Sequence, residues 1–166
     1  MNKRGLFLLY LLQCLIGVII GFYLYRTRPE LGAWCLISII LVLAPERKDA
    51  LTLALNRIKA NLVGAAVGLI LFFIHPMNLF MMSLGVILAV VICELLKLQA
   101  VTRSAAVAVI IILMHEPGRY FYDVALERAA GVIGGCGIAM LLTFTLHTVL
   151  KKSGLMPEYA DNQPQG

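Results

Sequence analysis

Long runs of apolar residues alternate with short polar clusters along this chain. No Asp, Glu, Lys or Arg occurs in residues 5–25 or in residues 60–93, and the polar clusters TRPE and ERKD separate the runs in between. A helix that crosses the hydrocarbon core of a membrane needs about 20 apolar residues at a rise of about 1.5 Å each. The pattern therefore predicts a protein built from membrane-spanning helices.

Breaks in this pattern divide the chain into six predicted spans. The uncharged run of residues 60–93 is too long for one helix, and the sequence HPMN at 75–78 divides it into a hairpin. The second and fifth spans are short, and each is followed closely by a proline, which ends a helix. We expect the first run to be a retained span, since no small-residue cleavage site follows it. The predicted spans are residues 6–25, 31–44, 60–74, 79–93, 104–114 and 129–149.

Polar leaders precede the third and sixth spans. The leaders ERKDALTLALNR and GRYFYDVALER both have the residue pattern of a helix. If these helices begin near Pro45 and Gly118, Arg57 and Arg128 lie about three turns from the helix starts. We therefore expect the two arginines at or just inside the membrane interface, on opposite sides of the membrane.

The two halves of the chain match each other after a shift of 71 residues, which places Arg57 on Arg128 and Gly64 on Gly135. The other matched pairs are Ala54 and Ala125, Leu55 and Leu126, Leu71 and Leu142, Phe73 and Phe144, Ile39 and Ile110, and Ile40 and Ile111. Each half holds three spans, and an odd number turns the second half upside down in the membrane. We predict an all-α integral membrane protein with six transmembrane helices in two inverted three-helix repeats, residues 1–75 and 76–149.

Composition agrees with a single membrane domain over residues 1–150. Hydrophobic residues make up 61% of the chain and charged residues 14%, against about 25% charged residues in a soluble domain. Ten Lys and Arg residues lie at one set of span ends and four at the other, which predicts cytoplasmic termini. The net charge of +5 reports this topology and does not indicate nucleic-acid binding. The polar tail, residues 151–166, is predicted to be cytoplasmic and disordered.

Five polar side chains near membrane depth are candidates for binding an anion. Arg57 and Arg128 carry permanent charges, and a guanidinium binds a carboxylate through two parallel hydrogen bonds. The alternative is that each arginine snorkels, extending its side chain to the lipid headgroups. The candidate set is completed by Arg103 at the start of the short fifth span, by Asn61 and by Lys59.

Glycines recur at four-residue spacing in three of the predicted helices. This spacing places small residues on one helix face, where a second helix can approach closely. The pairs are Gly17 and Gly21, Gly64 and Gly68, and Gly131 and Gly135. We predict helix packing at these six glycines, either within the fold or at the interface of a homodimer.

The remaining polar residues offer little catalytic chemistry. Glu94 has two candidate roles, an ion pair with Arg103 or the transfer of a coupling proton. The four cysteines lie inside apolar runs without metal-ligand spacing and are expected to be small buried hydrophobes. Trp34, near a span end, is expected in the aromatic belt of the interface. The sequence contains no nucleophile triad, phosphate loop or metal-ligand cluster, so we expect no enzyme, no metal and no cofactor.

One motif occurs twice and carries a family resemblance. The pattern Arg-x-x-small-x-x-x-Gly stands at residues 57–64 and again at 128–135, together with the apolar hairpin around HPMN and the stretch VVICELLKLQAVTRSAAVAVIIIL. These features resemble the membrane unit of the aromatic acid exporter and fusaric acid resistance (FUSC) superfamily, in particular its bacterial exporter branch. The similarity covers residues 5–148. Ala60 and Asn61 depart from it, since the family usually has Gly-Thr there.

The resemblance implies a function as well as a fold. It implies a multi-pass unit of the bacterial inner membrane that exports aromatic or other organic anions and pairs with a second unit. The implied partners are membrane lipid, an organic anion and a second copy in a homodimer or higher homo-oligomer. The residues of this chain that match the motif are Arg57, Gly64 and Gly68, and Arg128, Gly131 and Gly135. Two alternatives stay open: a passive anion channel, and a membrane subunit that transports nothing itself.

Overall fold

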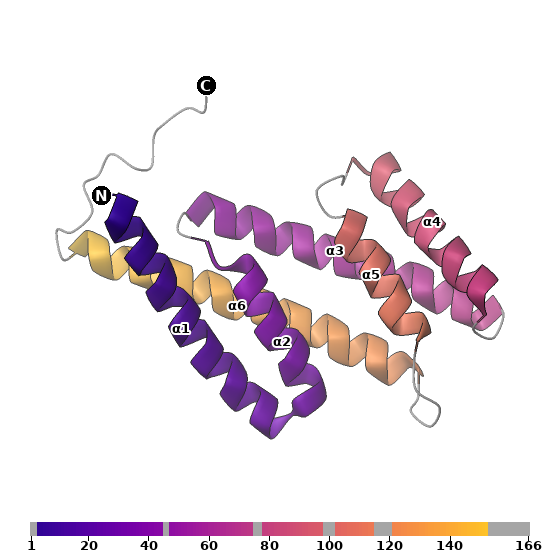
Figure 1. The fold of residues 1–166 in the computed structure, drawn as a ribbon, viewed down its shortest axis with the longest axis horizontal. Coiled ribbons are helices and arrows are strands. Elements are labelled where there is room, and N and C mark those ends of the chain that lie inside the picture. Colours follow the sequence, from indigo (N-terminus) through magenta and orange to yellow (C-terminus); the bar gives the residue numbers. More distant parts are fainter. Residues whose placement is uncertain (1–2, 45–46, 75–77, 98–101, 115–120, 153–166) are drawn as a thin grey trace.

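The computed structural model describes residues 3–44, 47–74, 78–97, 102–114 and 121–152, and this part of the chain is helical almost throughout. Its elements are α1 (Lys3–Thr27), α2 (Pro29–Val42), α3 (Arg47–Ile74), α4 (Leu79–Leu95), α5 (Thr102–Leu113) and α6 (Phe121–Lys152) (Figure 1). The predicted all-α fold and its six helices are confirmed. The predicted breaks at Pro45 and at 75–77 lie outside the described residues, as do residues 153–166 of the predicted tail.

Local sequence explains where several helices begin. Pro29 occupies the first turn of α2, where its missing N–H is not needed. Asn78 caps α4, since its side-chain oxygen accepts a hydrogen bond of 2.8 Å from the Met81 backbone N–H. The described parts of the two polar leaders, residues 47–57 and 121–128, are helical as expected, so α3 and α6 begin well before the apolar segments that they contain. The consequence is two helices of 28 and 32 residues.

Within the described residues, three helices are long and apolar enough to cross a membrane, judged by length and composition. These segments are Phe7–Thr27, Lys48–Ile74 and Asp123–Val149. The helices α2, α4 and α5 are apolar but shorter, with 14, 17 and 12 residues. Twelve residues extend over about 18 Å, whereas the hydrocarbon core is about 30 Å thick. The helices thus support a membrane protein, and the prediction of six full crossings in two inverted repeats stays a prediction.

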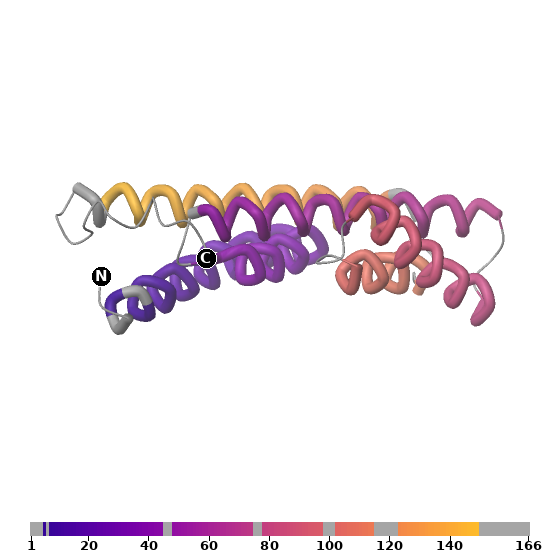
Figure 2. Tube along the Cα trace, turned by 90° about the horizontal axis from the view of Figure 1, so that it is seen from above, coloured from indigo at the N-terminus to yellow at the C-terminus, as the bar shows by residue number. Residues whose placement is uncertain are grey.

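The helices form two layers, with α3 and α6 antiparallel in one of them (Figures 1 and 2). The hairpins α1–α2 and α4–α5 lie against the same side of this pair, one toward each end. Helix α2 packs mainly on α6, and α5 packs mainly on α3. Each hairpin therefore rests on the long helix of the other half of the chain. Neither half has a complete core of its own.

Because each hairpin packs on the long helix of the other half, the molecule contains two apolar cores. One is built by α3, α4 and α5 around buried residues such as Val67, Cys93 and Val109. The other is built mainly by α2 and α6 around residues such as Ile39, Val132 and Cys136. Close van der Waals packing of these side chains stabilises the contact between the halves. The space between the two cores is where α2, α3, α5 and α6 meet.

Glycines allow the closest helix approaches. Gly64 on α3 faces Ala105 and Ala108 on α5, and Gly135 on α6 faces Cys35 and Ser38 on α2. The other four glycines that the sequence singled out, Gly17, Gly21, Gly68 and Gly131, also meet a neighbouring helix of the same chain. The absent side chains let the backbones approach. These three glycine faces, on α1, α3 and α6, are therefore used within one molecule, and a homodimer would need a different surface.

Candidate functional site

The antiparallel pair α3 and α6 brings Arg57 and Arg128 to one place. The two helices overlap along their N-terminal parts (Figure 1), where Arg128 lies opposite Asn61. Arg57 is four residues before Asn61, which is about 6 Å along the axis of α3. The expectation that the two arginines lie on opposite sides of the membrane is therefore wrong. It assumed that each arginine stays near its own end of the helix pair, and it missed that the N-terminal parts of α3 and α6 lie side by side.

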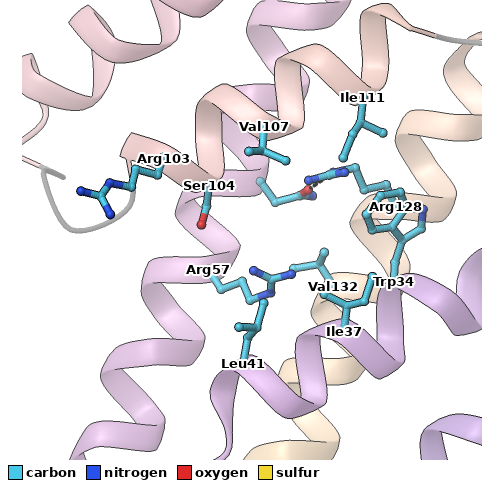
Figure 3. A pocket seen from close by; sticks show the side chains of 11 residues that line it. Trp34, Ile37, Leu41, Arg57, Arg103, Ser104, Val107, Ile111, Arg128 and Val132 are labelled. Carbon is cyan, nitrogen blue, oxygen red and sulfur yellow. Dashed lines mark hydrogen bonds between the residues drawn. The ribbon is translucent and has the colours of Figure 1, made fainter.

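A pocket of about 470 Å³ opens between α2, α3, α5 and α6 (Figure 3). A volume of this size is typical of small-molecule sites. The polar lining consists of Arg57, Asn61, Arg103, Ser104 and Arg128, and the apolar and aromatic lining of Trp34, Ile37, Leu41, Val107, Ile111 and Val132. The lining residues of the described chain include no Asp or Glu. The pocket therefore combines positive charge with an apolar wall.

Arg128 is the most enclosed charge of the pocket, with only 5% of its surface exposed. Its Nε donates a hydrogen bond of 2.8 Å to Asn61 Oδ1. Its Cζ lies 4.2 Å from the centre of the Trp34 ring, within the range of a cation–π contact. Nη1 is buried and donates to no group among the described residues. One guanidinium N–H group of Arg128 is thus left for another acceptor.

Arg57 is held differently. It is half-buried, and its Nε donates a hydrogen bond of 3.1 Å to Ser38 Oγ on α2. In Figure 3 its guanidinium points into the space between α3 and α6, toward the side from which Arg128 enters. Two permanent positive charges therefore share one partly enclosed site, which raises the attraction for an anion between them.

Three other candidates from the sequence lie less centrally. Arg103 contributes to the pocket lining but is exposed, and Figure 3 shows its guanidinium pointing away from the other two arginines. Lys59 is exposed and lies outside the pocket, because two residues turn the helix by about 200° relative to Arg57. Glu94 is exposed at the end of α4, a helix that contributes no residue to the pocket lining.

Sequence reasoning missed two residues that contact the arginines. Trp34 was expected in the interface belt, yet its ring lies on the Arg128 guanidinium. Ser38 is fully buried and binds Arg57, although it stands as one small polar residue within an apolar run. A polar residue inside an apolar helix usually faces the bundle interior. That signal would have found Ser38, but no sequence signal pairs Trp34 with Arg128.

The pocket lies between the two halves of the chain and is lined by matching positions of both. Gly64 meets Ala105 and Ala108 on α5, and the matching Gly135 meets Cys35 and Ser38 on α2. Positions of α2 therefore correspond to positions of α5 that lie 70 residues later, whereas the shift between α3 and α6 is 71 residues. This alignment matches Ile37 with Val107, Leu41 with Ile111, Trp34 with Ser104, Arg57 with Arg128, and Asn61 with Val132, and all ten residues line the pocket. The first two pairs keep their apolar character, whereas Trp34 and Asn61 have no chemical equivalent in the second half.

Comparison with known proteins identifies one family. A family model described as fusaric acid resistance protein-like matches residues 14–142, which include α2 to α5 and both pocket arginines. No curated protein and no solved structure matches the chain. The family match thus covers the whole of the pocket lining.

Proposed function

This chain belongs to the fusaric acid resistance protein-like family, and we propose from that premise that it exports aromatic or other organic anions across a bacterial inner membrane. The family and the apolar helices together identify a membrane protein of the transporter or resistance type. The substrate class and the direction of transport are the proposed part. The substrate class rests on the chemistry of the pocket, and the direction of transport rests on the resistance role that the matched family's description names.

The observation that carries the proposal is the meeting of Arg57 and Arg128 in one pocket whose described lining holds no carboxylate. Two guanidinium groups without a carboxylate leave a net positive charge in a partly enclosed, low-dielectric site. A carboxylate satisfies this charge and accepts parallel hydrogen bonds from a guanidinium. The apolar wall of Ile37, Val107 and Ile111 then suits the hydrocarbon part of an organic acid.

Snorkelling does not account for Arg128. A snorkelling arginine extends its guanidinium to the headgroup region and stays in contact with water. Arg128 is 95% buried, since only 5% of its surface is exposed, and its guanidinium contacts Asn61 and Trp34 inside the molecule. A charge kept at this depth is expensive, and such residues usually serve an ion or substrate pathway.

The proposal includes a homodimer and contains no enzymatic step. The surfaces of Ile37, Leu41 and Val107 at the edge of the pocket are 40%, 53% and 51% exposed. The half-buried Arg57 beside such an open edge would face lipid in a single molecule, which is costly. A second copy placed over this edge would cover the apolar rim and close the anion path. The chain contacts lipid on its other apolar faces.

The first prediction concerns flux through purified protein in proteoliposomes, with benzoate as the transported probe. We expect saturable benzoate flux that Arg57→Ala and Arg128→Ala each reduce at least about tenfold, because each change removes a charge-assisted contact with the carboxylate. Lys59→Ala is the matched control, since it removes a cation from α3 outside the pocket. It should leave flux within about twofold.

Other outcomes would contradict parts of this function. Unitary currents of benzoate without saturation would identify a channel instead of a transporter. Absence of flux in well-folded protein, across a panel of organic anions, would favour a subunit that transports nothing itself. If Arg57→Ala, Arg128→Ala and Lys59→Ala all leave the flux unchanged, the two arginines take no part in transport.

A further inference from the structure

Two uncharged groups hold the buried guanidinium of Arg128. Asn61 Oδ1 accepts a hydrogen bond from Nε at 2.8 Å, and the Trp34 ring lies 4.2 Å from Cζ. Asn61 is itself 95% buried, since 5% of its surface is exposed. The two contacts come from different helices, α3 and α2, so they fix the guanidinium from two directions.

The chemistry of these two groups preserves the charge that they hold. A buried arginine is commonly neutralised by a carboxylate, which also occupies its N–H donors. An amide oxygen satisfies one donor, and an aromatic face attracts the cation through its quadrupole, yet neither cancels the charge. Nη1 of Arg128 remains buried with no acceptor among the residues that the structure describes. The site is thus built to leave both a charge and a donor available.

Only one of the two arginines is held in this way. The position that corresponds to Asn61 in the second half is Val132, and the position that corresponds to Trp34 is Ser104. Arg57 therefore has neither an amide nor an aromatic ring at the matching places. Among the described residues its guanidinium donates one side-chain hydrogen bond, to Ser38 Oγ at 3.1 Å, and Arg57 is less buried than Arg128. The two halves thus hold their matching arginines with different strength.

We propose that Trp34 and Asn61 are positioning residues that hold Arg128 as the fixed anion contact, while Arg57 is the adaptable one. This inference rests on the proposed anion transport and assigns different tasks to the two arginines within it. Arg128 determines the affinity for the carboxylate. Arg57 rearranges during transfer, because a single hydroxyl group restrains its side chain.

The chain offers a built-in reporter for this assignment. Trp34 is its single tryptophan, and its ring lies on the guanidinium that would bind the anion. A carboxylate bound to Nη1 of Arg128 changes the charge next to the indole, so tryptophan fluorescence reports binding separately from flux. Binding and transfer can therefore be measured as two different quantities.

The test titrates the purified protein in lipid nanodiscs with benzoate and measures the KM of benzoate flux in proteoliposomes. We expect a saturable fluorescence change that Arg128→Ala abolishes and Arg57→Ala retains, although Arg57→Ala reduces flux. Asn61→Asp places a carboxylate beside Nε and should raise both the Kd and the KM at least about tenfold. Asn61→Gln keeps an uncharged amide oxygen as acceptor and should stay within about threefold of the native protein.

Asn56→Asp is the matched control, because it makes the same change on α3 at a residue that does not line the pocket. It should leave Kd and KM unchanged. If Asn61→Asp fails to fold, Trp34→Leu replaces it, with a raised KM and an unchanged maximal flux as the expected result. A native Kd in Asn61→Asp, or loss of binding in Arg57→Ala but not in Arg128→Ala, would overturn the assignment. Flux without any saturable fluorescence change would also overturn it, whereas absence of flux in the native protein would refute the proposed function beneath it.

Discussion

At the scale of single residues, what an arginine does here depends on the groups around it. Arg57, Arg103 and Arg128 all contribute to one pocket, but only Arg128 is almost fully buried. Burial without a carboxylate partner costs free energy that a structural role does not return. The high cost at Arg128 therefore supports the proposal that this residue contacts the anion.

A comparison of Arg103 with Arg128 tests whether a residue that lines the pocket also binds the anion. Its guanidinium is exposed and points away from the other two (Figure 3), so Arg103→Ala should change benzoate flux by no more than about threefold. Arg128→Lys should reduce flux at least about tenfold although it keeps the charge, because an ammonium cannot reproduce the planar hydrogen-bonding fork. Flux assays on the two variants side by side measure this difference. Equal losses of flux in the two variants would indicate that Arg103 also contacts the anion.

At the scale of helices, close packing at glycines sets the width of the pocket. Gly64 and Gly135 hold α5 against α3 and α2 against α6, so the two short helices become the side walls of the space above the long pair. Ser38, the partner of Arg57, lies directly at the Gly135 contact. The packing of α2 on α6 and the position of Arg57 are therefore coupled.

Adjacent glycines of α6 allow a controlled test of this packing. A Cβ atom at Gly135 would meet the Cys35 carbonyl oxygen and lie 2.7 Å from the Ser38 Cβ, whereas one at Gly134 meets nothing within 4 Å. Gly135→Ala should lower the free energy of unfolding by about 1–3 kcal/mol through overpacking. Gly134→Ala should leave stability unchanged or raise it by up to about 1 kcal/mol through helix propensity. Thermal unfolding in one detergent compares them, and equal midpoints would show that α2 does not pack on Gly135 this tightly.

At the scale of the whole molecule, the two halves depend on each other. Each hairpin rests on the long helix of the other half, and the pocket lies where the halves meet. The start of α1 and the end of α6 lie at one end of the molecule, and the end of α3 and the start of α4 lie at the other (Figures 1 and 2). This arrangement supports the proposal that both termini share one side of the membrane.

Cysteine labelling in intact cells tests that orientation. Leu79, at the start of α4, is 77% exposed, and Leu79→Cys should react with an impermeant maleimide added outside. A cysteine appended to the C-terminus should react only after permeabilisation, because we propose that the termini are cytoplasmic. The unmodified protein gives the background, which reports any reaction of the half-buried Cys14, since Cys35, Cys93 and Cys136 are buried. Labelling of both positions from the same side would contradict this topology.

The sequence by itself determined the elements and the class of protein. Uncharged runs, prolines and polar clusters specified six helices, because helix length and helix ends depend on local chemistry. The matching positions of Arg57 and Arg128 were visible as a repeat, and their charge pointed to an anion. Lys59 was a candidate because it lies near Arg57 in the sequence, but it points to a different side of the helix.

Only the tertiary structure decided which of these residues share a site. The Arg57–Ser38 hydrogen bond joins residues 19 positions apart, and the Arg128–Asn61 hydrogen bond joins residues 67 positions apart. Such pairs depend on how α3 and α6 overlap and on how far α2 lies along α6. Those offsets are set by the packing of many apolar and glycine contacts together. The local sequence pattern does not determine these offsets, so the contact between Trp34 and Arg128 follows only from the way the helices pack.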